Sequence, residues 1–492
     1  MEEKEFKLVR ARLMLPMSDR LGRDKRIEDG FVLIQGSKII DVGKYEPGIG
    51  EKISAEYGSN LHVIGMKKTD GLCEKDIPCI NGVILPCFVK AHGHDHESPI
   101  IGVAKDEPLT SWLDHAVNLF SGFMDEKRED LEKKFGTSPN FVTYIKARLD
   151  DTSYGITSSM NHHCNFNKYR VQEIVEANTL AGTKMIVAVG GQDRNYDPRI
   201  LDTPECSVKR LDEYVEKFGS TERISIIPGP DQVFSNGPEQ LKALKSWARD
   251  KGSLIHIHSS EEPGTTKWFT EKYGMTPVEY LKDIDFIDSD TVLAHQVNNT
   301  PNDLEIIKES GAIVVHNPLA NTILGSGMPP VVKMLEMGIP VVISTDGSGS
   351  ADNQNILAAA RCASQYQKAN LKDASLLPAQ KLLEMITVDP ANMLRLNTGS
   401  LEKDKDADVI VIDLTKPNMT PTRVDNVVEN LIWSSNGSET RYVIANGKIL
   451  MDDFKFCALD AEKIKHDVFE LSRMFAEYKE VAEEIRGTGV HK

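Results

Sequence analysis

The sequence predicts an α/β protein in which a (β/α)8 TIM-like barrel carries a small β-sandwich domain formed by both chain termini. Apolar strands alternate with amphipathic helical stretches from about residue 83 to about residue 395, whereas short strands and turns dominate the two ends. Eight strand–helix repeats over roughly 300 residues are typical of a closed parallel barrel. An open doubly wound sheet is the alternative fold, and no Gly-x-Gly-x-x-Gly motif after a strand supports a dinucleotide site.

The chain therefore divides into four segments. Residues 1–86 and 397–456 are the two parts of the β-sandwich domain, residues 87–396 are the barrel, and residues 457–492 are a C-terminal helix. A chain of 492 residues is too long for one simple core, which also favours more than one domain.

Strands of the terminal domain are predicted from apolar runs bounded by turn residues. They are expected at residues 6–14, 30–34, 38–42, 408–413 and 440–450. Residues 46–78 are polar and show no clear period, which indicates an insertion or a long loop. The last segment shows helical spacing of apolar side chains, which predicts an amphipathic helix packed on its own domain or on a neighbouring subunit. These side chains are Ile464, Val468, Leu471, Phe475 and Tyr478.

Barrel strands are predicted from short apolar runs separated by helical stretches. The first belongs to the apolar run 83–89, which we interpret as one buried strand. The eight predicted strands cover residues 88–92, 156–160, 185–189, 224–227, 254–258, 292–295, 313–316 and 341–345.

Composition and charge exclude several classes of protein. A net charge of −16 argues against a nucleic-acid partner, because phosphates require clustered Lys and Arg. No apolar run approaches the roughly 18 residues of a membrane helix, and residues 1–5 lack the pattern of a signal peptide. The seven cysteines are scattered without a Cys-x-x-Cys motif, which fits a reducing compartment. We therefore expect a cytoplasmic protein.

Histidines and one aspartate stand at the ends of the predicted barrel strands. His92 and His94 follow the first strand, and side chains two apart on a strand point to one face. His258 ends the fifth strand, and Asp346 follows the last. In a parallel barrel the carboxyl ends share one rim, where the active sites of this fold are built. Three imidazoles and one carboxylate there predict a site for one divalent cation, zinc or another borderline ion such as Fe²⁺.

Catalytic roles follow from this predicted metal site. A bound divalent cation lowers the pKa of water, which indicates hydrolysis. Glu261 follows His258 by three residues, where a carboxylate can carry a proton from the water to the leaving group. His295 ends the next strand and is expected to orient the water or polarise the electrophile. Asp346 is expected to take the first proton while it ligates the metal.

The order of these motifs resembles the amidohydrolase superfamily over nearly the whole chain. Leu85-Pro-Cys-Phe-Val-Lys-Ala-His-Gly-His94 is similar to the family's first-strand signature. Later signatures are matched by His258-Ser-Ser-Glu261, Ala294-His295, His316-Asn317-Pro318 with Asn321, and Thr345-Asp346-Gly347. The resemblance is to the metal-dependent deaminases of aromatic N-heterocycles, a group with cytosine-, guanine- and adenosine-type deaminases and chlorohydrolase-like members. It implies a distorted (β/α)8 barrel, one catalytic metal and the roles given above for Glu261, His295 and Asp346.

Some positions depart from the pattern of relatives that act on adenosine-like substrates. Those relatives tend to carry Arg-Gly where this chain has Ile101-Gly102, and often His where it has Asn298. Asn161-His162-His163 is similar to the Asp-His-His of deaminases that act on oxidised purines and pterins. These differences favour a purine-, pterin- or triazine-like ring over a nucleoside.

Five side chains are candidates for holding such a ring. Trp112 occupies the family's position for a pocket aromatic, and its ring can stack on a flat substrate. His162 and His163 end a strand on the catalytic rim and offer hydrogen bonds to the ring edge. His96 follows the metal pair, and Gln192 follows the third strand, so we expect both to reach the pocket.

The resulting hypothesis is hydrolytic deamination of an amino-substituted N-heterocycle with release of ammonia. One alternative is hydrolysis of a cyclic amide, or of a C–N or C–Cl bond on a ring, because the same activated water can perform it. Another is a non-catalytic scaffold, which the intact ligands, Glu261 and His295 disfavour. The expected partners are a small heterocyclic substrate and further copies of the chain in a dimer or larger homo-oligomer, with neither nucleic acid nor membrane.

Overall fold

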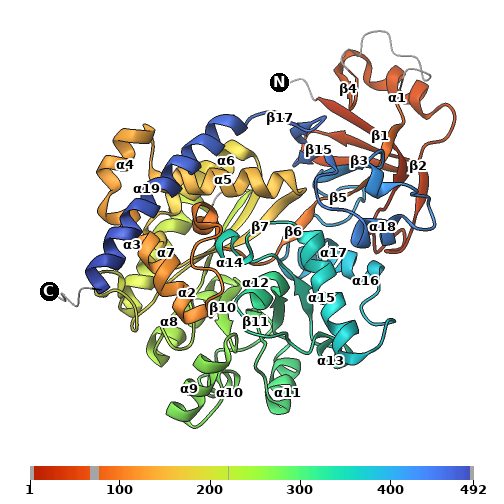
Figure 1. The fold of residues 1–492 in the computed structure, drawn as a ribbon. Coiled ribbons are helices and arrows are strands. Elements are labelled where there is room, and N and C mark those ends of the chain that lie inside the picture. Colours follow the sequence, from red (N-terminus) through yellow and green to blue (C-terminus); the bar gives the residue numbers. More distant parts are fainter. Residues whose placement is uncertain (1–4, 67–76, 220, 488–492) are drawn as a thin grey trace.

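Strands from both ends of the chain hydrogen-bond into one sheet in the structure, a computed structural model that describes residues 5–66, 77–219 and 221–487. Within these residues the sheet has nine strands in the order β17-β16-β15-β14-β5-β1-β2-β3, and β4 pairs with β1. It lies beside the barrel, with red N-terminal strands next to blue C-terminal ones (Figure 1). The strands are β1 (Phe6–Met14), β2 (Ile27–Gln35), β3 (Lys38–Lys44), β4 (Leu61–Val63), β5 (Ile80–Pro86), β14 (Val409–Asp413), β15 (Thr440–Ala445), β16 (Lys448–Asp452) and β17 (Lys455–Phe456).

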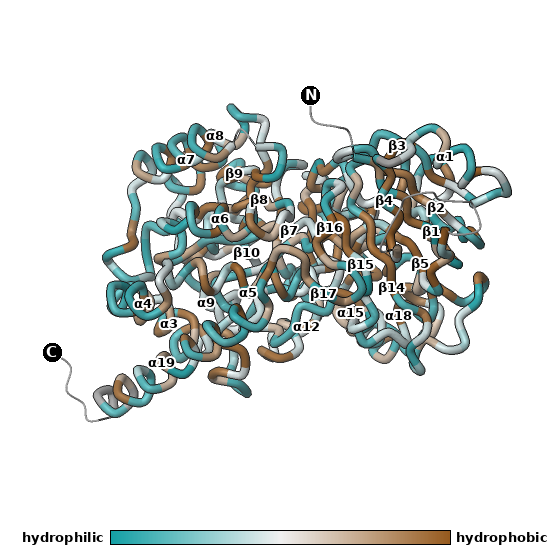
Figure 2. Tube along the Cα trace, turned by 90° about the horizontal axis from the view of Figure 1, so that it is seen from above, coloured by the Kyte–Doolittle hydropathy of each residue, from teal (hydrophilic) through white to brown (hydrophobic). Residues whose placement is uncertain are grey.

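Successive side chains along these strands point to opposite faces of the sheet, and apolar side chains are buried on both faces. On β2, Val32 and Ile34 share one core with Val409 and Val411 of β14, although the two strands stand apart in the sheet order. The alternate side chains of β2 pack in a separate core with α1 and β4. The apolar strands of this region are brown in Figure 2. One domain is thus built from both termini, as predicted; the boundaries after residues 86, 396 and 456 stay a prediction.

Residues 46–78 are not simply a loop. The structure has helix α1 (Ile49–Tyr57) and strand β4 there, and residues 67–76 lie outside the described part of the chain. Ile49, Ile53 and Tyr57 are four residues apart, so they form one apolar stripe on α1 that packs into the second core of the sheet. The expectation of a long loop is therefore wrong for these elements, because the charged residues between the stripe positions hid its period.

Eight parallel strands form the barrel as two four-stranded halves, which confirms the predicted fold class. The halves join through a parallel bridge between Gln232 and His258. They join again where the Ser344 hydroxyl accepts from His92 N–H and donates to the His92 carbonyl. The strands are β6 (Phe88–Lys90), β7 (Ile156–His163), β8 (Lys184–Val189), β9 (Ile224–Pro228), β10 (Ile255–Ser259), β11 (Thr291–His295), β12 (Ile313–His316) and β13 (Val341–Ile343).

The apolar run 83–89 is divided between the two sheets and is not one strand. β5 ends at Pro86 in the terminal sheet, and β6 begins at Phe88 in the barrel. Cys87 N–H donates to the Asp408 carbonyl, whereas Phe88 N–H donates to the Gly155 carbonyl. The change of partners at this point is a tertiary event that hydrophobicity alone does not reveal.

Helices connect and cover the barrel strands, and many begin with proline at the first helical position, where its missing N–H costs nothing. Thr276 and Thr300 cap α10 and α11 in capping boxes. The covering helices are α5 (Pro139–Ser153), α6 (Val171–Ala181), α7 (Pro204–Phe218), α8 (Pro238–Lys251), α9 (Pro263–Tyr273), α10 (Pro277–Asp283), α11 (Pro301–Ser310), α12 (Pro318–Ile323), α13 (Val331–Glu336), α14 (Ser348–Ala351), α15 (Ile356–Leu371), α16 (Ala379–Glu384), α17 (Val388–Met393) and, between β14 and β15, α18 (Val427–Trp433).

The chain between β6 and α5 forms a helical segment above the rim of the barrel. It contains the 3-10 helix η3 (Asp95–Ile100), α2 (Leu109–Trp112), the π-helical turn η4 (Leu113–Val117), α3 (Asn118–Glu126) and α4 (Arg128–Phe135). The predicted C-terminal helix is confirmed as α19 (Ala461–Gly487), which runs beside α3 and α5 (Figure 1). Its Leu471 and Phe475 share a core with Trp112, Phe120 and Phe123, so it packs on its own chain. Within the described residues, no helix combines the length and apolar character needed to cross a membrane.

Candidate metal centre and active site

All residues predicted around the metal lie at the carboxyl ends of barrel strands, and all are buried. They come from four different strands or the turns that follow them, so the barrel brings together residues far apart in sequence. They are His92 and His94 after β6, His258 in β10, Glu261 after it, His295 at the end of β11, and Asp346 after β13.

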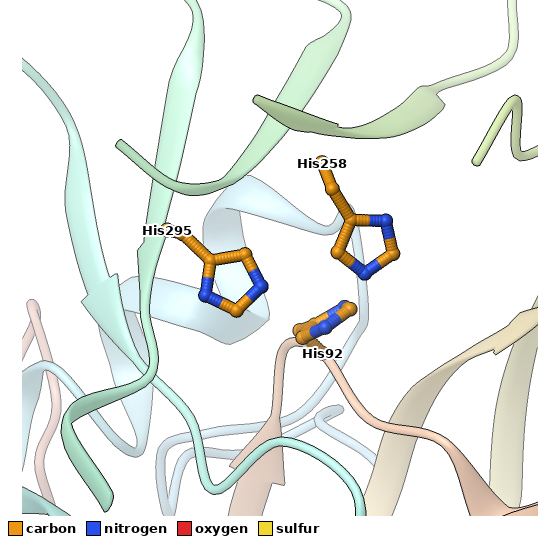
Figure 3. Close-up of side chains that lie close together, drawn as sticks. All are labelled: His92, His258 and His295. Atoms are coloured by element: carbon orange, nitrogen blue, oxygen red, sulfur yellow. The ribbon is translucent and has the colours of Figure 1, made fainter. Parts of the chain in front are cut away.

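Ring nitrogens and one carboxylate converge on a common point. His92 Nε2 lies 3.3 Å and His94 Nε2 lies 3.7 Å from Asp346 Oδ1, and His94 Nε2 lies 3.2 Å from His258 Nε2. Ligand atoms bound about 2.1 Å from one ion would be roughly 3.0–3.5 Å apart. The rings of His92, His258 and His295 also point toward one another (Figure 3), and one nitrogen of each lies within 4.8 Å of one nitrogen of the other two.

The donor atoms fit a divalent cation. Both nitrogens of His92 and Nδ1 of His94 are buried without a hydrogen-bond partner in the described residues, and such orphaned groups are costly unless something binds them. Burial, together with neighbouring imidazoles, lowers the pKa of His92 and His94 well below the usual value and that of His258 to about 3. The imidazoles are therefore neutral, which is the form that ligates a metal.

Main-chain groups hold the ligands in place. His258 Nδ1 lies 2.7 Å from the Asp231 carbonyl and donates to it, which leaves Nε2 free for a metal. Asp346 Oδ1 accepts from Gly347 N–H at 2.7 Å. His295 and Asp346 have φ angles of 74° and 73°, a left-handed conformation that is uncommon for residues with a side chain and that clusters at functional sites.

Glu261 and His295 face each other across the site. Glu261 Oε2 lies 3.5 Å from His295 Nε2. The Asn321 amide nitrogen lies 3.0 Å from His295 Nδ1 and donates to it, so the proton of the neutral ring stays on Nε2, toward Glu261 and Asp346. Burial raises the pKa of Glu261 well above its usual value, and the charges of Asp346 and Asp231 raise it further. These surroundings disfavour the charged form of the carboxyl.

Glu97 is a further carboxylate of the centre, and it lies beside the turn that carries Asp346. Its Oε2 accepts from Gly349 and Ser350 N–H, each at 3.2 Å. A Cβ on Gly347 would lie 2.0 Å from that oxygen, which explains the glycine after Asp346. Burial, and then the charge of Asp346, raises the pKa of Glu97. Glu97 thus anchors α14, which follows Asp346, to the segment that carries His92 and His94.

Residues 83–450 match the model of the amidohydrolase family. The chain belongs to this family. The resemblance inferred from the ordered motifs is therefore confirmed.

Curated relatives and a solved structure of similar fold extend this result. A 5-methylthioadenosine/S-adenosylhomocysteine deaminase of Caldanaerobacter subterraneus subsp. tengcongensis is 30% identical over 458 residues, 90% of this chain and 94% of that protein. A 5'-deoxyadenosine deaminase of Methanococcoides burtonii is 29% identical over 443 residues, 90% and 92% of the two chains. The crystal structure of atrazine chlorohydrolase from Arthrobacter aurescens TC1 complexed with zinc has a TM-score of 0.81 at 22% identity, over 95% of this chain and 100% of that one. It shares the amidohydrolase fold.

Two adjoining cavities lead to the metal centre of this amidohydrolase. The inner one is about 40 Å³ and is lined by His94, His258, Glu261, His295 and Asp346 among others. The outer one is about 670 Å³. A buried water needs roughly 15 Å³, so the inner cavity has room for a few waters but not for a heterocyclic ring. The residues that line both cavities, and so form the wall between them, are Leu113, Asn118, Asn165 and Tyr196.

The five predicted substrate contacts occupy different environments. Trp112 and His96 line the inner cavity. His162 turns into the barrel, with Nδ1 3.0 Å from His256 Nδ1 and Nε2 3.4 Å from Asp231 Oδ1.

His163 and Gln192 lie outside the linings of both cavities. The His163 ring packs on Tyr144 of α5, with ring centroids 5.2 Å apart, and its Nδ1 lies 3.2 Å from the Asn167 carbonyl. The Gln192 side chain is fully buried, and neither of its amide atoms has a hydrogen-bond partner among the described residues.

Sequence reasoning missed Asp231 and Cys164. Both line the inner cavity, and each directly follows the end of a barrel strand or lies within three residues of it. Asp231 comes after Pro228-Gly-Pro at the end of β9. No site residue was predicted from the sequence at the end of this strand. The same rule that identified His258 and Asp346, a polar residue at a carboxyl strand end, could have found Asp231.

Proposed function

We propose that this amidohydrolase is a metal-dependent aminohydrolase that removes the amino group of a planar N-heterocycle as ammonia. The observation that carries the proposal is the convergence of His92, His94 and His258 with Asp346, beside the Glu261 carboxyl that faces His295. Named deaminases of adenosine derivatives among the relatives support the same chemistry.

We infer one divalent cation at this centre, zinc or iron, held by His92, His94, His258 and Asp346. When bound, such a cation lowers the pKa of a water molecule and so supplies a nucleophile at neutral pH. Zinc is supported by the histidine-rich ligand set, although iron accepts the same donors.

Glu261 and His295 complete the reaction. The raised pKa of Glu261 lets it give a proton to the ring nitrogen next to the amino-bearing carbon, which makes that carbon electrophilic. Asp346 takes a proton from the attacking water. His295 Nε2–H donates to the oxygen that becomes the product carbonyl. Asp346 passes its proton to the amino group, which leaves as ammonia. The remaining proton of the added water returns to Glu261 as the carbonyl forms, so one water is consumed for each ammonia formed.

The sizes of the two cavities limit which substrates can reach the centre. A ring reaches the centre only when the wall of Leu113, Asn118, Asn165 and Tyr196 opens, and Trp112 then offers a stacking face with His96 at the ring edge. The outer cavity of about 670 Å³ adjoins this position and has room for a substituent on the ring. A purine that carries a substituent is therefore a further candidate substrate, in addition to the unsubstituted purine-, pterin- and triazine-like rings.

We further propose a cytoplasmic homo-oligomer. The scattered cysteines support the compartment, and a small heterocycle as the diffusible partner agrees with the relatives' names.

The decisive experiment is a screen for ammonia release by metal-loaded enzyme. The panel contains 5'-deoxyadenosine, S-adenosylhomocysteine, adenine, guanine, an aminopterin-type ring and an amino-triazine. We expect ammonia from at least one, with the best substrate showing whether the outer cavity accepts a sugar. Absence of ammonia from the whole panel would refute deamination and favour cyclic-amide hydrolysis.

A further inference from the structure

A second group of metal-ligating side chains lies beside the centre described above. Cys164 follows β7, Asp231 follows β9, His162 lies in β7 and His96 lies in η3. The ligand atoms of His162, Cys164 and Asp231 all lie within 4.8 Å of one another, and a nitrogen of His96 lies within 4.8 Å of the Cys164 sulfur. The proposed function uses neither Cys164 nor Asp231 as a ligand.

Nitrogens in this group lack partners although they are buried. His96 is 2% exposed, and neither of its ring nitrogens has a hydrogen-bond partner in the described residues. His162 is fully buried, and its Nε2 faces the Asp231 carboxylate at 3.4 Å. A buried polar atom without a partner is rare in a native protein and usually marks a bound water, ion or ligand.

The acidic member of the group is already oriented. The Tyr196 hydroxyl donates to Asp231 Oδ2 at 2.5 Å, while Oδ1 lies 3.4 Å from His162 Nε2. Asp231 therefore directs Oδ1 toward His162. One imidazole, one thiolate and one carboxylate are donor types of zinc sites that keep the fourth position open.

We propose that His162, Cys164 and Asp231 bind a second divalent cation, of the borderline-soft class to which Zn²⁺ and Co²⁺ belong. Cys164 and Asp231 line the inner cavity, so the ion faces the space that the heterocycle enters. Asp231 connects the two sites, because its main-chain carbonyl accepts from His258 Nδ1. His162 thereby acts as a ligand and not as a direct contact to the ring. The inference goes beyond the proposed function and does not depend on it.

Cobalt substitution tests the second site in the full-length chain. Apoprotein is reconstituted with Co²⁺, bound cobalt is counted by elemental analysis, and the near-ultraviolet spectrum is searched for thiolate-to-cobalt charge transfer. We expect two cobalt ions per chain and a charge-transfer band. One ion per chain without the band in the wild type would overturn the proposal, whatever the variants do.

Variants assign the band to this cysteine. Cys164→Ser and His162→Ala should each lower bound cobalt by about one ion per chain, and Cys164→Ser should abolish the band. Cys362→Ser, a half-buried cysteine outside both cavities, is the matched control and should keep both. A band that persists in Cys164→Ser, or that is lost in Cys362→Ser, overturns the assignment.

A last variant separates this proposal from the first metal site. His92→Ala removes a ligand of the proposed catalytic ion only, so it should lower cobalt content while the thiolate band remains. Loss of the band in His92→Ala would contradict a separate second site. Unchanged cobalt in that variant, with the band intact, would refute the catalytic site and leave the second site standing.

Discussion

Glu261 and Glu262 are neighbours in sequence but have different environments. The Glu261 carboxyl faces His295 inside the centre. The Glu262 carboxylate accepts from Gly264 and Thr265 N–H and so caps α9. Of the two, only Glu261 faces the centre, so the proposed proton transfer is assigned to it.

Glu261→Gln should therefore separate chemistry from metal binding. The amide keeps the size of the side chain but cannot exchange a proton, and proton transfer by one side chain contributes roughly 10²–10⁴-fold. We expect kcat for ammonia release to fall by about that factor while metal content stays the same. Steady-state kinetics and elemental analysis on the same preparation measure both.

Glu262→Gln is the matched control for this variant. It leaves the centre intact and should change kcat by less than about 2-fold, because an N-cap contributes about 1 kcal/mol to stability and nothing to catalysis. A Glu261→Gln enzyme with wild-type turnover would rule out the proton-transfer role.

At the residue scale, much of the centre was predictable. His92, His94, His258 and Asp346 were found because each follows or ends an apolar strand, and parallel strands bring such positions together. Adjacent strand residues point to opposite faces, so His162 and His163 were never both able to reach the cavity. The sequence does not say which one faces inward, because that depends on the register of β7 against β6 and β8.

At the scale of elements, the hydrophobic pattern of the sequence predicted the strands and helices that depend on local sequence alone. The barrel strands were recovered because each is a short apolar run between helices. The break at Cys87 was missed because it depends on strand partners that are distant in sequence. β5 pairs with β14 in the terminal sheet, whereas β6 pairs with β7 in the barrel. The π-helical turn at Leu113–Val117 has no sequence signature, yet it places Leu113 in the wall between the cavities.

Helix α19 supports that wall from outside. Phe475 is 1% exposed, and its ring centroid lies 5.0 Å from that of Phe120 and 5.6 Å from that of Phe123 on α3. Helix α3 begins at Asn118, which lines both cavities. Packing of the C-terminal helix is thereby connected to the entry of the substrate.

Phe475→Ala tests this support. Loss of a buried phenylalanine ring costs about 3–5 kcal/mol, which denaturant unfolding measures. We also expect KM to rise while metal content is unchanged, because the wall loses its backing and the centre does not. Phe469→Ala on the same helix is the control: its side chain is 65% exposed, so stability should change by less than about 0.5 kcal/mol. Equal effects of the two variants would contradict the role of α19.

At the scale of the whole molecule, a buried ion-pair group joins the barrel to the terminal domain. Lys184 at the start of β8 donates to Asp406 Oδ2 at 2.6 Å and to Asp408 Oδ2 at 2.7 Å, just before β14. Lys38 of β3 donates to the other oxygen of Asp406 at 2.5 Å. The Lys184 side chain is 7% exposed and that of Lys38 is 47% exposed. One carboxylate therefore has a buried partner from the barrel and an exposed partner from its own sheet.

The pKa shifts set the pH range of this contact. Burial alone raises the pKa of Asp406, but hydrogen bonds from Lys184 and Lys38 lower it below the usual value overall. A carboxylate with a lowered pKa stabilises the fold above the unfolded value of about 3.9 and loses that contribution as pH falls. Burial lowers the pKa of Lys184, but Asp408 and Asp406 raise it overall. The lysine therefore keeps its contribution up to about pH 10.

Lys184→Met should consequently destabilise the protein by about 3 kcal/mol at neutral pH, because it leaves Asp408 buried without its cation. Denaturant unfolding as a function of pH should show the difference from wild type persisting between about pH 5 and 10 and shrinking below about pH 4, where Asp406 takes up a proton. Lys38→Met removes the exposed partner of the same Asp406 and should cost less than about 1 kcal/mol. Equal destabilisation of the two variants would contradict the role of Lys184 in joining the two domains. A difference in free energy of unfolding between Lys184→Met and wild type that grew in acid would contradict it as well.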